Sequence, residues 1–150
     1  MQIIEGNITD INEGVIVQQV NCMGAIGAGV SGAIIKKWPK VKKDYLAKCS
    51  EYPRQELLGM ITVTAVSRSL FVVNLFSQYS YGNSAKTGIV YTDMDVLVHG
   101  LKTLVYLYGK TGQQIYVPYG IGCGLAGGNW QELVRRTEEL PIIAVKLPNY

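Results

Sequence analysis

The sequence is poor in the residues that most often hold metal ions or transfer protons. It has one histidine, His99, and three cysteines, Cys22, Cys49 and Cys123, which lack the spacing of a zinc site. A single histidine excludes a multi-histidine metal site, and an odd number of cysteines without a pairing pattern is explained most simply by reduced thiols. We therefore expect neither a bound metal ion nor a cofactor.

Long hydrophobic runs and strong charge of either sign are also missing. No apolar run reaches the roughly 18 residues that a membrane-spanning helix needs, and the N-terminus lacks a signal-peptide pattern. Of the 150 residues, 48% are hydrophobic and 17% are charged, which is typical of a globular chain that forms one domain. We expect a single domain over residues 1–150 with no membrane partner, located in the cytoplasm, or in the host cytoplasm if its source is a virus.

The net charge of +3 owes much to one segment. Residues 36–48 hold six lysines and one aspartate. Such a run can bind nucleic acid, but it is more commonly the solvated face of a helix. Nucleic acid is therefore an alternative partner and not the expected one.

Apolar residues recur with two different periods along the chain. Runs rich in β-branched and aromatic residues predict strands at 1–5, 14–20, 59–66, 70–76, 114–118 and 142–147. A helical period predicts helices at about 29–38, 40–50, 92–108 and 129–139, with Thr92 and Asn129 as N-caps. This alternation predicts an α/β fold, a three-layer α/β/α sandwich with a central mixed sheet.

Two glycine-rich loops, at residues 24–32 and 120–128, each follow a predicted strand and lead into a helix. Ligands of open α/β sheets bind beyond the carboxyl ends of the strands, where glycines let backbone N–H groups approach an anion. A helix N-terminus adds partial positive charge. The glycines could instead serve only tight turns and packing, but two loops in matching contexts favour a phosphate or diphosphate site. Neither loop has the GKS or GKT of a P-loop, which disfavours nucleotide hydrolysis of that kind.

Three motifs together resemble those of macro domains, the ADP-ribose-binding modules. They are GNIT at residues 6–9, VNCMGAIGAGVSGAI at 20–34 and PYGIGCGLAGGNW at 118–130. The similarity covers essentially the whole chain, and it is closest to the branch that resembles ADP-ribose-1''-phosphate phosphatases. It implies the macro domain fold, with ADP-ribose or ADP-ribose 1''-phosphate as the ligand.

The resemblance also implies roles for individual residues. Asn7, where macro domains usually carry aspartate, and the backbone N–H of Ile8 would contact adenine, since an asparagine can accept through its carbonyl oxygen. Asn21 matches the asparagine at the end of the strand before the first loop. Tyr150 would stack on the base, with a frayed terminus as the equal alternative. The residues implied at the phosphates and the distal ribose are Gly27, Ala28, Gly29 and Val30 in the first loop, Gln78 after the fourth strand, and Gly122, Cys123, Gly124 and Leu125 in the second loop.

Departures from the family pattern bear on catalysis. Hydrolytic macro domains often carry a second asparagine where Gly24 stands. The branch with a catalytic lysine has this residue soon after the fourth strand, where this chain reads NLFSQYSYG (74–82). Ala126 replaces an aspartate of that branch. The NLFSQYSYG stretch resembles small domains that remove the phosphate from ADP-ribose 1''-phosphate, so we expect this hydrolysis, with no residue assigned as the catalytic base. The alternatives are a non-catalytic reader or sponge for ADP-ribose, and an ADP-ribosyl hydrolase acting on a protein or nucleic acid.

Two side chains with catalytic chemistry receive a structural interpretation instead. His99 lies within a predicted helix and is expected to be a partly exposed structural residue. No C-x5-R signature follows Cys123, so its thiol is interpreted as a small packing group in the second loop.

Overall fold

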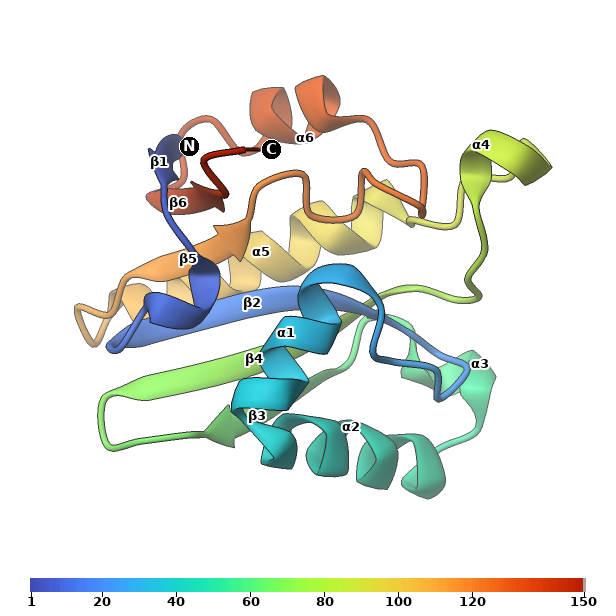
Figure 1. The fold of residues 1–150 in the computed structure, drawn as a ribbon, viewed down its shortest axis with the longest axis horizontal. Coiled ribbons are helices and arrows are strands. Elements are labelled where there is room, and N and C mark those ends of the chain that lie inside the picture. Colours follow the sequence, from blue (N-terminus) through green and yellow to red (C-terminus); the bar gives the residue numbers. More distant parts are fainter. Residues whose placement is uncertain (150) are drawn as a thin grey trace.

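A computed structural model describes residues 1–149, which form a six-stranded sheet with helices on both faces (Figure 1). The strands are β1 (Gln2–Glu5), β2 (Gly14–Asn21), β3 (Ile61–Ala65), β4 (Leu70–Gln78), β5 (Ile115–Pro118) and β6 (Ile142–Lys146). The helices are α1 (Gly29–Lys37), α2 (Pro39–Glu51), α3 (Arg54–Leu57), α4 (Ser84–Thr87), α5 (Met94–Gly109) and α6 (Trp130–Arg136), with a 3-10 turn η1 (Ile8–Asp10). The strand order is β1-β6-β5-β2-β4-β3, and among the strands within residues 1–149 only β3 and β4 pair in antiparallel fashion. The expected mixed sheet and three-layer α/β/α architecture are confirmed.

The central strand β2 is buried on both faces. Val15 and Val17 pack in one core with residues of α5 and α6, whereas Ile16, which points the other way, packs with Ile34 of α1 and Val41 of α2. This follows from the period of two along a strand, which sends successive side chains to opposite faces. An apolar run without alternation is the pattern of a strand covered on both faces.

The helix starts were predicted correctly for α6 but not for α5. The side chain of Asn129 accepts from the N–H of Glu132, as expected of an N-cap. For α5 the cap is Asp93, whose side chain accepts from the N–H of Val96, so the prediction of Thr92 was wrong. The hydroxyl of Thr92 donates instead to the carbonyl oxygen of Gly122, a tertiary contact that the local sequence does not indicate.

The lysine-rich segment ends α1 and forms most of α2. Its core-facing residues are Val41 and Tyr45, and five of its six lysines are exposed to solvent. Lys40 pairs with Asp44 at 3.4 Å, and Lys48 lies over the ring of Tyr52 at 5.1 Å from its centre. These contacts fit a solvated helix face that is partly neutralised by its own neighbours.

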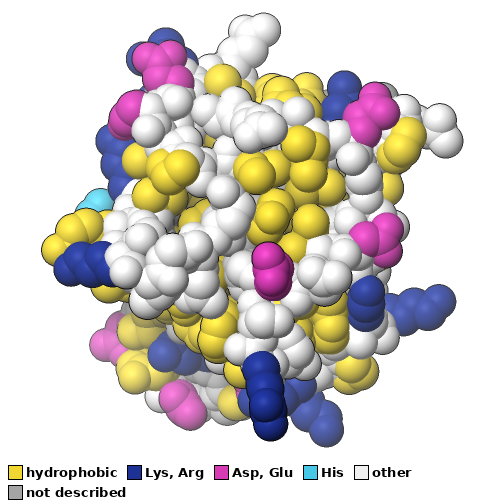
Figure 2. Space-filling view, turned by 90° about the vertical axis from the view of Figure 1, so that its left-hand side faces the viewer, with side chains coloured by type: hydrophobic (Ala, Val, Ile, Leu, Met, Phe, Trp, Pro, Cys, Tyr) yellow, Lys and Arg dark blue, Asp and Glu magenta, His cyan; other side chains and the backbone are white. Residues whose placement is uncertain are grey.

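Figure 2 shows the end of the molecule at which the β3–β4 and α5–β5 turns lie. Charged side chains are spread around this face, and apolar side chains are exposed between them. His99 is exposed on α5. No helix within residues 1–149 combines the length and the apolarity that crossing a membrane requires.

Candidate functional site

A cleft opens at the carboxyl ends of the central strands, between the two glycine-rich loops. After β2 the chain turns into α1 on one face of the sheet, whereas after β5 it leads to α6 on the other face (Figure 1). Because β2 and β5 are adjacent, their loops diverge and leave a crevice, as at the topological switch point of other open α/β sheets.

The cleft consists of two adjoining cavities of about 330 and 370 Å3. Both are lined by Gln19, Ala28, Ser31, Gln78, Leu125 and Ala126, which mark their junction. The first cavity extends along the first loop to Asn21 and Tyr81, and the second extends to Pro118 and Tyr119. One elongated site therefore joins the two loops.

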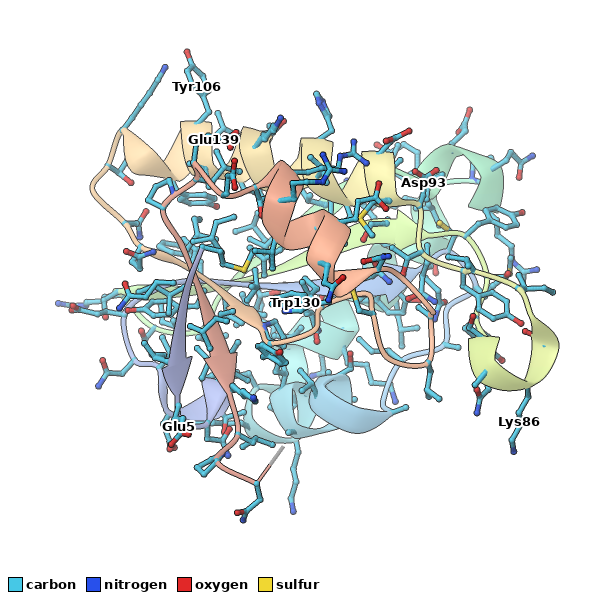
Figure 3. All side chains as sticks on the ribbon, turned by 90° about the horizontal axis from the view of Figure 1, so that it is seen from above. Glu5, Lys86, Asp93, Tyr106, Trp130 and Glu139 are labelled. Atoms are coloured by element: carbon cyan, nitrogen blue, oxygen red, sulfur yellow. The ribbon has the colours of Figure 1, made fainter. Side chains whose placement is uncertain are left out.

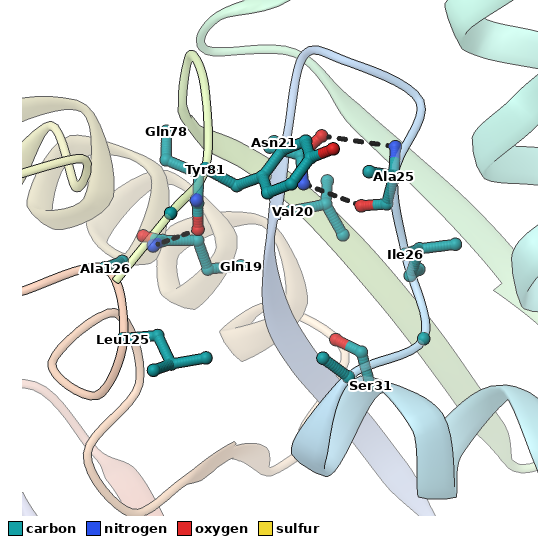
Figure 4. A pocket seen from close by; sticks show the side chains of 13 residues that line it. Gln19, Val20, Asn21, Ala25, Ile26, Ser31, Gln78, Tyr81, Leu125 and Ala126 are labelled. Carbon is teal, nitrogen blue, oxygen red and sulfur yellow. Dashed lines mark hydrogen bonds between the residues drawn. The ribbon is translucent and has the colours of Figure 1, made fainter. Parts of the chain in front are cut away.

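Asn21 shapes the first loop (Figure 4). Its Oδ1 accepts from the N–H of Met23 at 2.9 Å and of Ala25 at 3.4 Å, and its Nδ2 donates to the carbonyl oxygen of Ala25 at 2.6 Å. The buried hydroxyl of Tyr45 lies 3.0 Å from the same Oδ1 and donates to the backbone oxygen of Asn21 at 2.8 Å. Asn21 lines the cleft, and its polar atoms hold the loop in shape.

The N-terminus of α1 faces the cleft at the end of this loop. A Cβ on Gly32 would lie 2.7 Å from the carbonyl oxygen of Gly27, so a larger residue would push the helix away from the loop. The first N–H groups of a helix have no partner within it and carry the positive end of its dipole. The structure places Gly27, Ala28, Gly29 and Val30, the residues implied in this loop, along the cleft, with Ser31 beside them.

The second loop offers backbone donors from the other side. Within residues 1–149, no acceptor is found for the N–H groups of Gly122, Gly124, Leu125 and Ala126, and all four residues line the second cavity. Three of the four residues predicted in this loop are thus placed at the cleft.

Cys123 is the fourth, and the structure does not bring it to the cleft. Its N–H donates to the carbonyl oxygen of Gly120 at 2.8 Å, and its Sγ lies 3.3 Å from the carbonyl oxygen of Ile121. Burial raises the pKa of the Cys123 thiol to about 11. A thiol that stays protonated near neutral pH is a poor nucleophile, which supports its role as a packing group.

The segment between β4 and α5 supports the second loop. The N–H of Ser84 donates to the carbonyl oxygen of Leu125 and that of Tyr91 to the carbonyl oxygen of Ala126, both at 2.8 Å. These bonds tie the loop to the segment before α5 through its carbonyl oxygens and leave several of its N–H groups without a partner in the described part of the chain. Lys86 lies on α4 and points away from the sheet (Figure 3), so it does not reach this site.

Gln19 lies on the floor of the cleft and was not predicted. Its Nε2 lies 2.8 Å from Oε1 of Gln78 and 2.9 Å from Oγ1 of Thr92, and its Oε1 accepts from the hydroxyl of Ser77 at 2.7 Å. Gln18 and Gln19 interrupt an otherwise apolar central strand, and this pair of polar residues was the signal in the sequence.

Gln18 makes a second network on the opposite face of the sheet. Its Nε2 donates to Oδ1 of Asn74 at 2.8 Å, and its Oε1 accepts from the hydroxyl of Ser31 at 3.0 Å. Asn74 in turn donates to the carbonyl oxygen of Val41 in α2 at 3.3 Å. Because Gln18 and Asn74 are buried, these bonds hold the first turn of α1 against the sheet.

Asn7 and Ile8, which the resemblance implies for adenine recognition, line neither of the two cavities. Ile8 is buried among the apolar residues beneath α1. The Oδ1 of Asn7 accepts from the N–H of Thr9 at 3.0 Å and from its hydroxyl at 2.7 Å, so it caps η1. Tyr150 lies outside the described residues.

The described residues that line the cleft include no Asp, Glu, His, Lys, Arg or Cys. Their polar groups are the amides of Gln18, Gln19, Asn21 and Gln78, the hydroxyls of Ser31, Tyr81 and Tyr119, and the backbone. Within residues 1–149, no cluster of three or more His, Cys, Asp or Glu residues could hold a metal ion. The arrangement can therefore bind an anion through neutral donors, without repulsion from a carboxylate.

Solved structures share this fold over nearly the whole chain. A protein of unknown function from Bacteroides thetaiotaomicron is 27% identical, with a TM-score of 0.81 and 97% of each chain covered. The macrodomain of Thermus aquaticus DarG is 22% identical, with a TM-score of 0.72, covering 98% of this chain and 97% of that one. Thermosipho africanus DarTG in complex with ADP-ribose is 17% identical, with a TM-score of 0.74, covering 99% of this chain and 42% of that one.

No protein-family model matches the sequence, and no curated protein is similar to it at a significant level. The structural similarity shows that the chain has the fold of macrodomains.

Proposed function

We propose that the cleft binds ADP-ribose, with the diphosphate held between the two glycine-rich loops. The observation that carries this proposal is the convergence of unpaired backbone N–H groups of the second loop and of the α1 N-terminus on one cleft. The described residues that line this cleft include no carboxylate. The shared macrodomain fold supports it, and one of the similar structures holds ADP-ribose.

The lining residues suggest how the ligand would lie. The diphosphate would occupy the junction of the two cavities, near Ala28 and Ala126. The distal ribose would then lie in the first cavity beside Tyr81, and the adenosine would extend past Tyr119. Contacts of adenine with Asn7, Ile8 and Tyr150 rest on the sequence resemblance alone.

Hydrolysis of ADP-ribose 1''-phosphate is the second candidate function. The cleft offers this reaction backbone N–H donors, which stabilise negative charge that develops on a phosphate oxygen. Among the lining residues that the structure describes, only the tyrosines are ionisable, so the reaction would depend on these donors and on a positioned water molecule. Binding is therefore the function that the geometry supports best.

A charge placed beside the phosphates tests the binding proposal. Leu125 is 61% exposed and lines both cavities, so Leu125→Asp adds a carboxylate at the junction without disturbing the core. We expect calorimetry to show at least a tenfold loss of ADP-ribose affinity, about 1.4 kcal/mol. The neutral variant Leu125→Asn should retain most of the affinity, because it lacks the negative charge.

Leu107→Asp is the matched control, because Leu107 is 51% exposed on α5 and lies outside the cleft. Absence of ADP-ribose binding by the unmodified protein, or equal losses in Leu125→Asp and Leu107→Asp, would contradict the proposed site. Release of phosphate from ADP-ribose 1''-phosphate, abolished by Leu125→Asp, would support the second candidate. Binding without release would leave a non-catalytic reader.

A further inference from the structure

The amide groups on the floor of the cleft form a chain of hydrogen bonds with a fixed direction. One end of the chain is the carbonyl oxygen of Gly122, which accepts from the hydroxyl of Thr92. The other end is the carbonyl oxygen of Ser80, which accepts from Nε2 of Gln78 at 2.9 Å. Gln19 lies between Thr92 and Gln78 and bonds to both.

The two carbonyl oxygens decide which way every group in the chain turns, because a carbonyl can only accept. Thr92 has one hydroxyl hydrogen, and it is donated to Gly122. Thr92 must therefore accept from Gln19, which turns the Nε2 of Gln19 toward Thr92 and its Oε1 toward the hydroxyl of Ser77. The second hydrogen of the same Nε2 then goes to Oε1 of Gln78, at 2.8 Å.

The consequence falls on Gln78, which lines both cavities at their junction. Its Oε1 faces Gln19, and one of its two amide hydrogens goes to Ser80. Among the described residues, no acceptor is found for the remaining hydrogen. If Gln78 turned its amide over, its Nε2 would meet the Nε2 of Gln19, and its oxygen would meet the carbonyl oxygen of Ser80.

We infer that Gln19 is a positioning residue that makes Gln78 a hydrogen-bond donor to the ligand, so that the ligand atom at the junction is an oxygen acceptor. This inference rests on the proposed function and adds which partner donates the hydrogen bond in the contact between Gln78 and the ligand. A phosphate oxygen and a ribose oxygen both meet the requirement, and two ligands distinguish them. ADP carries the phosphates without the distal ribose, whereas ADP-ribose carries both.

The test compares Gln78→Leu, Gln19→Leu and the double variant, with Gln114→Leu as the matched control. Gln114 is also half-buried, but its amide bonds to the carbonyl oxygens of Ile115 and Pro141, outside the cleft. Calorimetry against ADP-ribose and ADP gives the affinities. The side-chain amide signal of Gln78 in 1H–15N spectra reports whether this amide is still held in place.

Gln78→Leu is expected to weaken ADP-ribose binding about tenfold, the upper end of the effect of one neutral hydrogen bond. Gln19→Leu should weaken it similarly and shift the amide signal of Gln78 in the free protein. Because both substitutions act through the same donor, the affinity of the double variant should be at most about twofold lower than that of the single variant that binds more weakly. Gln114→Leu should bind as the unmodified protein does.

A loss for both ligands assigns the acceptor to a phosphate, and a loss for ADP-ribose alone assigns it to the distal ribose. Unchanged binding by Gln78→Leu, or losses that multiply in the double variant, would overturn the inference. Failure of the unmodified protein to bind ADP-ribose would refute the proposed function instead. If Gln19→Leu does not fold, two variants of Thr92 replace it in the test. Thr92→Val should weaken ADP-ribose binding, whereas Thr92→Ser, which keeps the hydroxyl, should bind as the unmodified protein does. Equal binding by these two variants would also overturn the inference.

Discussion

Gly122 is the position where a single methyl group should disturb the site most directly. Its φ is +72°, a left-handed conformation that costs an L-residue roughly 1–2 kcal/mol. A Cβ would lie 2.9 Å from Oε1 of Gln19, 3.1 Å from Cδ2 of Leu97 and 3.2 Å from Oγ1 of Thr92. Crowding of this kind typically adds about 1–3 kcal/mol. Gly122→Ala should thus reduce the free energy of unfolding by roughly 2–5 kcal/mol in total.

The two costs can be separated with a glycine that has the same backbone and free space. Gly112 has a φ of +73° and no atom within 4 Å of an added Cβ. Gly112→Ala should therefore carry only the conformational cost of roughly 1–2 kcal/mol. The difference between the two variants measures the crowding against Gln19, Leu97 and Thr92.

Urea unfolding and calorimetry with ADP-ribose together decide the outcome. Gly122→Ala should lose more stability than Gly112→Ala and bind ADP-ribose at least about tenfold more weakly, because the methyl group displaces the amide floor and the N–H groups above it. Gly112→Ala should keep the affinity of the unmodified protein. Equal stability losses in the two variants would refute the packing argument, and full affinity in Gly122→Ala would refute the role of the second loop.

Asn21→Ala, which removes the bonds that shape the first loop, should lower the free energy of unfolding by about 1–3 kcal/mol in chemical denaturation and also weaken ADP-ribose binding. Tyr45→Phe, which removes only the buried hydroxyl, should lower the thermal midpoint by an amount equivalent to about 1 kcal/mol, and an unchanged midpoint would show that its bond to Asn21 contributes nothing. Burial raises the pKa of Cys22 and of Cys123 from 9.0 to about 11, so the unfolded chain loses these protons at a lower pH than the folded protein does. The free energy of unfolding should therefore fall as pH rises from about 9 to about 11. Chemical denaturation at pH 8, 9.5 and 11 checks this, and Cys123→Ala should make the decrease smaller. Replacing the exposed lysines within residues 36–48 by glutamate should leave the affinity for ADP-ribose unchanged. If the unmodified protein binds nucleic acid in a salt-dependent way and this variant does not, nucleic acid is supported as the alternative partner.

The sequence predicted the elements well because their signals are local. The buried strands and amphipathic helices follow from the spacing of apolar residues, and the predicted strand at 14–20 differs from β2 (Gly14–Asn21) by one residue. The short α3 and α4 were missed, since four residues are too few to show a helical period. The cap of α5 moved from Thr92 to Asp93 because the hydroxyl of Thr92 has a distant partner.

The glycine-rich loops were likewise recognisable in the sequence alone. Their composition and their position between strand and helix are local properties, and the N–H donors that they expose belong to the backbone. The directions of individual side chains were not recognisable. Cys123 lies within the second loop but does not line the cleft, and Asn7 is occupied with capping η1.

By itself, the sequence determined the layers of the fold and the presence of two glycine-rich loops between strands and helices, because both depend on residues that are close together in the chain. Only the tertiary structure decided which side chains meet at the floor of the cleft. Gln19 bonds to Ser77, Gln78 and Thr92, which are 58, 59 and 73 residues away. Those contacts depend on the register of β2 against β4 and on the path of the chain into α5, and a polar residue in a strand does not indicate which partner it will find.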